Sequence, residues 1–241
     1  MEQFKKAYVI GDIHGYHEQL IRLQKKIEDD AKLLKGKKLL IYLGDYIDRG
    51  PAVKDCIQSL IDFKPPNFTV VYLLGNHEQM LLDFLADKKS SLYLWINNGG
   101  LETLENYGNK MEQYIDESMQ LEFHDKIRDK FLSFLPETHK KFFYELKLSY
   151  EWQNYFFVHA GIDPSLPLSK QTKETMLWTR SEKFLNSNSP FEKMIIHGHT
   201  PSKKIIQKSN RLCLDTGVFF SGILSGAKIN SSNEIEFFST H

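Results

Sequence analysis

The fold of this chain is decided by a stretch that reads Tyr8-Val9-Ile10-Gly11-Asp12-Ile13-His14-Gly15. It is a short apolar run that ends at a glycine, and polar side chains follow it. Such runs are typical of buried strands. The glycine lets the backbone turn sharply at the strand end. We therefore predict a buried strand with an aspartate and a histidine just beyond its carboxyl end.

Two later stretches repeat this pattern. Residues 39–45 and 68–76 each contain an apolar run that ends in glycine and then in aspartate or asparagine. Helical patterns at about residues 17–34 and 53–63 separate the three runs. Alternation of strands and helices predicts a parallel α/β sheet.

The remaining sequence divides into a helical middle and a second set of strands. From about residue 79 to 148, charged residues interleave with Leu, Phe and Ile at three- and four-residue spacing, which predicts helices. Three further apolar runs precede His159-Ala160-Gly161, His197-Gly198-His199 and Asp215-Thr216-Gly217. A closing antiparallel pair is expected at residues 223–229 and 234–238. We expect one domain over residues 1–241 with a helical insertion at about 79–148.

The composition restricts the partners and the compartment. Among 241 residues, 31 basic and 31 acidic side chains cancel, so there is no net field to attract nucleic acid or an anionic membrane. The two cysteines, Cys56 and Cys213, lie in apolar runs and are interpreted as buried thiols. There is no signal-peptide pattern and no run long enough to span a membrane. We expect a cytoplasmic protein, and the sequence does not indicate an oligomeric state.

Five strand ends carry side chains that can bind metal. In open α/β sheets, ligands bind beyond the carboxyl ends of the strands, so these side chains are expected to converge. Oxygen and nitrogen donors suit manganese, iron or zinc. Two such ions about 3.5–4 Å apart can clamp the attacking and leaving oxygens of a displacement at phosphorus. The candidates are Asp12, His14, Asp45, Asn76, His77, His159 and His199.

These motifs resemble the signature of the metallophosphoesterases. They are similar in particular to the serine/threonine phosphoprotein phosphatases of the small bacterial and phage lambda type. The resemblance implies an α/β fold (α+β in some schemes), with a central β-sandwich flanked by helices in four layers. It spans nearly the whole chain and is weakest at about residues 110–149. It rests on Gly11-Asp12-Ile13-His14-Gly15, Gly44-Asp45-Tyr46-Ile47-Asp48-Arg49-Gly50, Gly75-Asn76-His77-Glu78, His159-Ala160-Gly161 and Gly198-His199-Thr200.

The resemblance also implies a role for each residue. Two divalent metal ions, manganese before iron or zinc, would supply a metal-bound hydroxide for in-line attack. His77 would protonate the leaving oxygen and Asp48 would orient His77. Arg49, Arg180 and Asn76 would bind the phosphate. The six ligands would be Asp12 and His14 on the first ion, Asn76, His159 and His199 on the second, and Asp45 bridging both.

Other polar residues near the motifs receive simpler interpretations. His197 is expected behind the ligands or in the core, and Asp215 in a structural turn. Glu78 is expected to accept hydrogen bonds from the backbone rather than to bind metal. The histidines without a partner pattern are interpreted as surface residues: His17, His124, His139 and His241.

The substrate is expected to be a phosphoprotein or a nucleotide. Phosphoserine and phosphothreonine proteins are favoured over diadenosine tetraphosphate cleaved symmetrically, because the dinucleotide hydrolases tend to have other residues where Glu78 and Thr200 stand. A metal-free phosphoprotein-binding scaffold would lack a ligand, and none is missing. The insertion should shape the pocket. Its aromatic residues could stack on a base but are more simply interpreted as helix packing: Tyr93, Trp95, Tyr107 and Phe123.

Overall fold

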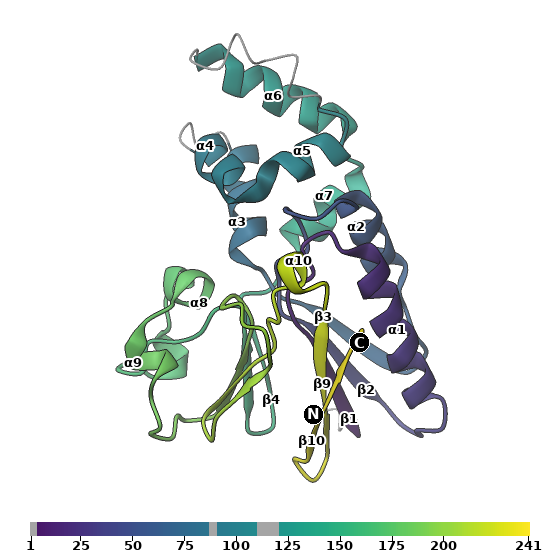
Figure 1. Ribbon diagram of the computed structural model, residues 1–241, viewed down its shortest axis with the longest axis vertical. Coiled ribbons are helices and arrows are strands. Elements are labelled where there is room, and N and C mark those ends of the chain that lie inside the picture. The colour runs from purple at the N-terminus through teal and green to yellow at the C-terminus, as the bar shows by residue number, and fades with distance from the viewer. Residues whose placement is uncertain (1–3, 87–90, 110–120) are drawn as a thin grey trace.

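The computed structural model describes residues 4–86, 91–109 and 121–241 (Figure 1). Two five-stranded sheets face each other. The first has the order β10-β9-β1-β2-β3 and contains β1 (Lys6–Ile10), β2 (Lys38–Tyr42), β3 (Phe68–Tyr72), β9 (Ser225–Asn230) and β10 (Ile235–Ser239). The second has the order β4-β5-β6-β8-β7 and contains β4 (Ser149–Trp152), β5 (Tyr155–Val158), β6 (Met194–His197), β7 (Ile206–Gln207) and β8 (Arg211–Cys213).

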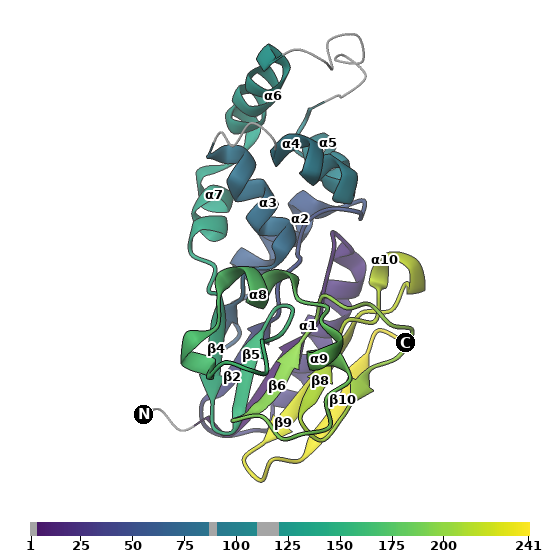
Figure 2. The same cartoon turned by 90° about the vertical axis from the view of Figure 1, so that its left-hand side faces the viewer.

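Helices cover the outer face of each sheet, so the molecule has the predicted four-layer α/β sandwich (Figure 2). On the first sheet lie α1 (His17–Ala31), α2 (Val53–Asp62) and α7 (Glu137–Tyr144). On the second lie a 3-10 turn (Leu168–Lys170), α8 (Lys173–Trp178) and α9 (Glu182–Leu185). At one end stand α3 (Asn76–Leu85), α4 (Ser91–Trp95), the π-helical turn η1 (Ile96–Gly100), α5 (Leu101–Asn106), α6 (Leu121–Phe134) and α10 (Val218–Ser221).

The alternation of side chains along β1 explains why the strand is apolar throughout. Tyr8 and Ile10 pack with the helices on the outer face, whereas Ala7 and Val9 pack against the second sheet. A strand buried on both faces has no solvent side that would need polar residues. β1, β2 and β3 run parallel, as predicted.

The sequence placed most boundaries within a few residues. The helices expected at about 17–34 and 53–63 are α1 and α2, and the expected antiparallel pair is β9 with β10. The strands β4 and β7 were not predicted. The described residues of the middle of the chain are mostly helical. The division of the chain into one domain with an insertion stays a prediction.

Two histidines predicted to lie on the surface are buried instead. His139 is 1% exposed, with Nδ1 2.7 Å from the Tyr107 hydroxyl and Nε2 3.0 Å from Gln58 Oε1. His124 is 7% exposed and its ring lies edge-on to Phe84. Both predictions were wrong because the helices of the middle segment pack on one another and on α2, which one-dimensional spacing does not reveal.

The other histidine and cysteine predictions fare better. His17 is half-buried, with Nε2 2.8 Å from the Ser59 hydroxyl, and His241 is exposed. Cys56 and Cys213 are buried free thiols, as expected. No helix within the described residues combines the length and apolarity that crossing a bilayer requires.

Candidate metal centre

The predicted ligands lie together beyond the carboxyl ends of strands from both sheets. Asp12 follows β1, Asp45 follows β2, and Asn76 begins α3 just after β3. His159 and His199 follow β5 and β6 in the other sheet. The site therefore bridges the two sheets at one end of the sandwich.

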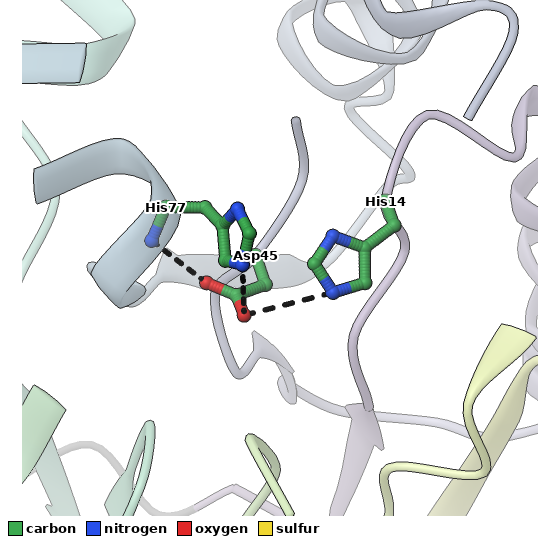
Figure 3. Close-up of side chains that lie close together, drawn as sticks. All are labelled: His14, Asp45 and His77. Atoms are coloured by element: carbon green, nitrogen blue, oxygen red, sulfur yellow. Dashed lines mark hydrogen bonds and ion pairs between the residues drawn. The ribbon is translucent and has the colours of Figure 1, made fainter. Parts of the chain in front are cut away.

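One group of donors surrounds Asp45 on the side of the first sheet (Figure 3). His14 Nε2 lies 3.7 Å from Asp45 Oδ2, and His77 Nε2 lies 3.9 Å from the same oxygen. His14 Nδ1 lies 3.0 Å from the Ile47 carbonyl, which can only accept, so Nδ1 carries the proton. The Nε2 lone pair of His14 is thereby left facing Asp45, as a metal ligand requires.

A second group of donors converges from the other sheet. The Asn76 side-chain oxygen lies 2.8 Å from His159 Nε2 and 2.8 Å from His199 Nδ1. His159 Nε2 also lies 3.3 Å from Asp45 Oδ1. His159 Nδ1 donates to the Leu43 carbonyl at 2.9 Å, which leaves Nε2 free to coordinate. Asp45 thus contributes one carboxylate oxygen to each group.

Asp12 completes the donor set with a carboxylate oxygen aimed into the site. Its Oδ2 accepts from the His199 backbone N–H at 2.9 Å, while its Oδ1 is buried without a hydrogen-bond partner among the residues that the structure describes. A buried carboxylate oxygen without a hydrogen-bond partner destabilises the folded state unless a cation binds to it. The oxygen and nitrogen donors present therefore fit a pair of divalent metal ions.

Burial and neighbouring charges shift the pKa values of Asp12 and Asp45 in opposite directions. Burial, reinforced by Asp215, raises the pKa of Asp12 well above its usual range. Burial would also raise the pKa of Asp45, but the imidazoles of His159 and His77 outweigh it and hold this pKa well below its usual range. Burial lowers the pKa of His14 to about 3, with His77 adding to the effect. A neutral His14 beside an ionised Asp45 is the protonation state in which both bind metal.

Two glycines at the strand ends act by making room rather than by turning. A Cβ on Gly198 would collide with Asp12 Oδ1, and a Cβ on Gly75 would collide with Asp45 Oδ1. Neither glycine has a positive φ. The constraint at these two positions is therefore the close approach of a carboxylate.

His77 lies beside the ligands with one ring nitrogen fixed from behind. His77 Nδ1 donates to Asp48 Oδ2 at 2.6 Å, and both side chains are buried. The opposite nitrogen, Nε2, faces the site and accepts from an Arg49 N–H at 3.2 Å. Burial lowers the pKa of His77 to about 4, and Arg49 adds to this effect while Asp45 opposes it.

Both predicted phosphate-binding arginines reach the same region. Arg49 is half-buried, its guanidinium lies 4.4 Å from the centroid of the Phe219 ring, and one N–H points at His14 Nε2 from 3.4 Å. Arg180 is exposed and donates to the His199 carbonyl at 2.9 Å. Hydrogen bonds and other close polar contacts thus link all ten predicted site residues into one cluster.

The three neighbours with simpler interpretations behave as expected. Glu78 accepts from the backbone N–H groups of Asp45, Tyr46, Ile47 and Gly75 at 2.7–3.2 Å. Asp215 accepts from the Gly217 N–H at 2.9 Å in a turn. His197 is buried behind the ligands, where Arg211 donates to its Nε2 at 3.1 Å.

Sequence reasoning missed other residues that shape the site. Trp95 and Thr103, from the helical middle segment, donate hydrogen bonds to Asp48. Phe219 in α10 packs edge-on against His14, and Trp178 in α8 packs edge-on against His199. Trp178 is 37% exposed. None of these residues belongs to a strand-end motif, so local spacing carried no signal for them.

Comparison with known proteins agrees with this geometry. The family model of the calcineurin-like phosphoesterases matches residues 5–222. The chain belongs to this family. It is therefore a metallophosphoesterase, a class of hydrolase that uses a pair of divalent metal ions. Within the described residues, two groups of side chains could hold a metal ion, namely His14, Asp45 and His77 in one and Asp45, His159 and His199 in the other.

The proteins to which this phosphoesterase is similar are named for more than one activity. It is 26% identical to serine/threonine-protein phosphatase 1 of Salmonella typhimurium, over 95% of this chain and 94% of that protein. It is 27% identical to the asymmetrical bis(5'-nucleosyl)-tetraphosphatase PrpE of Anoxybacillus flavithermus, over 91% and 89%. Its fold matches a cold-active protein-tyrosine phosphatase of a Shewanella species, with a TM-score of 0.58 at 17% identity over 98% and 80%.

Proposed function

We propose that this phosphoesterase is a dinuclear metal-dependent phosphomonoester hydrolase that acts on phosphoserine and phosphothreonine in proteins. One observation supports the reaction type above the others. His77 belongs to one of two groups of side chains that share Asp45, and its Nδ1 is anchored on Asp48, which leaves Nε2 to deliver a proton. A hydrolase for phosphate esters with poor leaving groups needs this combination, since the leaving oxygen must receive a proton.

Six residues would hold the metal pair, which we expect to be manganese. Its chemistry, when bound, is Lewis acidity toward the phosphate and activation of a water for in-line displacement. The first ion would be held on the side of the first sheet and the second on the side of the other sheet, with Asp45 between. The ligands would be Asp12, His14, Asp45, Asn76, His159 and His199.

The remaining site residues bind the phosphate and move the proton. Arg49 and Arg180 present guanidinium groups whose planar N–H pairs match phosphate oxygens, and the Asn76 amide can add a donor. A phosphate anion held there attracts positive charge to the His77 ring and offsets the lowering effect of Arg49 on its pKa. His77 Nε2 then passes its proton to the leaving oxygen, while the Asp48 carboxylate stabilises the imidazolium.

The exposure of the aromatic residues favours a protein substrate. Trp95 and Tyr107, which could have stacked on a base, are buried in the helical core and cannot contact a dinucleotide. Tyr93 is 54% exposed, and the side chain of Phe123 lies outside the described residues. Among the described residues, two of the aromatic side chains that could have stacked on a base are therefore out of its reach.

A dinucleotide tetraphosphate is the second candidate substrate. Trp178 and Phe220 are 37% and 52% exposed, and each belongs to an element that contacts the metal ligands. Either exposed ring could stack on an adenine whose phosphates lie at the metal ligands. The likeness to an asymmetrical bis(5'-nucleosyl)-tetraphosphatase points to the same substrate class.

A side-by-side assay distinguishes the two. The protein with added manganese is offered phosphoserine and phosphothreonine peptides, diadenosine tetraphosphate and p-nitrophenyl phosphate. We expect turnover of the peptides and of p-nitrophenyl phosphate. Activity on diadenosine tetraphosphate alone would overturn the protein phosphatase assignment.

Replacement of the bridging ligand tests the mechanism. Asp45→Asn should lose bound metal and hydrolysis of every substrate together. Asp55→Asn, on the exposed face of α2, is the matched control and should change neither. Rates equal to wild type in Asp45→Asn would rule out the two-metal mechanism.

A further inference from the structure

The Asp48 carboxylate is held from more than one side. Its Oδ2 accepts from His77 Nδ1 at 2.6 Å and from the Trp95 indole N–H at 2.9 Å. Its Oδ1 accepts from the Thr103 hydroxyl at 2.5 Å. Asp48 is fully buried, and burial raises its pKa well above the usual range, while the hydrogen bonds from Thr103 and Trp95 act in the opposite direction and favour the ionised carboxylate. Two of the three come from the helical middle segment rather than from the sandwich.

The geometry around Thr103 fixes where its proton points. The Thr103 oxygen accepts from the Asp48 backbone N–H at 3.0 Å, so its own hydrogen is directed to the Asp48 carboxylate. Trp95 is fully buried, and its ring packs on Phe84 and Phe131 with centroids 5.3 and 6.0 Å apart. Neither donor can rotate away without disrupting its own surroundings.

The same helical turn also holds the neighbouring arginine. The Gly99 carbonyl accepts from the Arg49 backbone N–H at 3.1 Å, and the Asn98 carbonyl accepts from Arg49 Nε at 3.4 Å. Gly99 has a φ of 101°, and a Cβ there would approach the Arg49 side chain to 2.7 Å. The segment from Trp95 to Thr103 thus contacts both Asp48 and Arg49 through backbone and side chains.

We propose that Trp95 and Thr103 are positioning residues of the hydrolysis, which hold the Asp48 carboxylate so that it orients the His77 imidazole toward the leaving oxygen. The inference rests on the proposed function, in which His77 is the proton donor. It makes the helical segment part of the acid-catalysis apparatus as well as a wall of the site. If Trp95 or Thr103 no longer donates its hydrogen bond, the Asp48 carboxylate can rotate. The His77 imidazole that it anchors is then no longer held in the orientation needed for proton transfer.

Leaving-group dependence tests this role. Phenyl phosphate expels a poor leaving group that needs a proton, whereas p-nitrophenolate leaves as a stable anion. For Thr103→Val and Trp95→Phe, we expect kcat on phenyl phosphate to fall about 10–10²-fold, part of the contribution of general acid catalysis. We expect kcat on p-nitrophenyl phosphate to fall about twofold or less, because that reaction relies little on the acid. KM and metal content should match wild type, and Thr103→Ser should restore the phenyl phosphate rate.

Matched controls separate positioning from folding. Thr69→Val on β3 and Trp152→Phe on β4 make the same chemical changes away from the site and should leave both rates unchanged. His77→Asn is the reference, and we expect it to lose about 10²–10⁴-fold on phenyl phosphate with metal retained.

Each outcome has a separate meaning. If His77→Asn affects both substrates equally, the acid role in the proposed function is wrong. If His77→Asn discriminates between the substrates but Thr103→Val and Trp95→Phe lower both rates equally, or neither, then the positioning role alone is overturned.

Discussion

Residues of the site adopt backbone conformations that side chains normally avoid. The φ angles of His14, Asp45, Asp48, Arg49 and His199 lie between 46° and 71°. A left-handed conformation costs about 1–2 kcal/mol in a residue other than glycine. The surrounding contacts must impose it, and such strain gathers at functional sites. Asparagine tolerates this region well, so Asp45→Asn changes the chemistry of the ligand with little change in the backbone.

Gly198→Ala should disable the site without unfolding the protein. The new Cβ would strike Asp12 Oδ1, so either the carboxylate or the His199 loop must move. Displacement of catalytic groups by about 1 Å lowers rates about 10²-fold, and we expect a loss of that order together with weaker metal binding. Metal content by mass spectrometry and kcat are the measurements.

Gly36→Ala is the control for this substitution. Gly36 has a φ of 90°, so alanine there is strained, but its nearest neighbour is the Lys5 side chain, away from the site. We expect about 1 kcal/mol lower stability with normal metal content. Full activity in Gly198→Ala would show that the close approach to Asp12 does not matter.

Arg49→Lys tests phosphate recognition at the same scale. Lysine keeps the charge but cannot present two parallel N–H groups. The loss of one charge-assisted hydrogen bond, about 1.5–3 kcal/mol, should raise KM roughly tenfold or more while metal content stays normal. Arg22→Lys on the exposed face of α1 is the control. An unchanged KM would remove Arg49 from the phosphate-binding set.

At the scale of elements, α1 is joined to the first sheet through Asp30. Its carboxylate accepts from Lys6 at 3.0 Å and Tyr8 at 2.6 Å on β1, and from Lys228 at 2.9 Å on β9. Burial would raise the pKa of Asp30, but the hydrogen bonds from Lys228, Tyr8 and Lys6 outweigh it and lower this pKa to about 2. The helix and two strands therefore share one anchoring carboxylate.

This anchor predicts a pH-dependent stability. Because the folded-state pKa is depressed, the contribution is complete above pH ~4, near the unfolded pKa of a carboxyl group, and is lost as the pH falls toward 2. Asp30→Asn should lower the free energy of unfolding at pH 7 by about 1 kcal/mol, since solvent screens a partly exposed group. Urea unfolding at pH 7, 4 and 3 measures the difference in unfolding free energy between wild type and Asp30→Asn. This difference should become smaller as the pH is lowered. Glu28→Gln, exposed on the same helix, should show no such trend; a constant difference for Asp30→Asn would contradict the assignment.

The elements that were predicted and those that were missed differ in a physical way. β1 and β2 are buried on both faces, and β3, although partly exposed, consists of Phe, Thr, Val and Tyr residues, so these three runs stand out in the sequence. β7 spans only Ile206–Gln207, and β4 includes the exposed Glu151, so neither forms an apolar run. Both are outer strands of their sheet, as β3 is, but they lack the apolar run that made β3 predictable.

For the whole molecule, predictability depends on sequence separation. The ligand motifs were predictable because each lies next to a strand end, and parallel strands place those ends together. The contacts of Asp48 were not predictable, because Trp95 and Thr103 lie 47 and 55 residues away along the chain. His139 was placed wrongly for the same reason, since its partner Gln58 is 81 residues away. Packing of the helical segment decided these contacts, and no local pattern encodes it.

A bound metal pair should hold the two sheets together, because its proposed ligands come from both. Asp12, His14, Asp45 and Asn76 belong to the first sheet, and His159 and His199 to the second. A ligand at 100 times its dissociation constant stabilises the folded state by about 2.7 kcal/mol. For a chain of this size, chelation should then lower Tm by roughly 5–10 °C. It should also speed amide exchange at the carboxyl ends of β5 and β6, and added manganese should reverse both effects. Asp45→Asn is the matched control, since a protein that holds no metal has none to lose and its Tm should not respond to the chelator. An equal response in Asp45→Asn, or no response in the wild type, would show that this cluster does not join the sheets through metal.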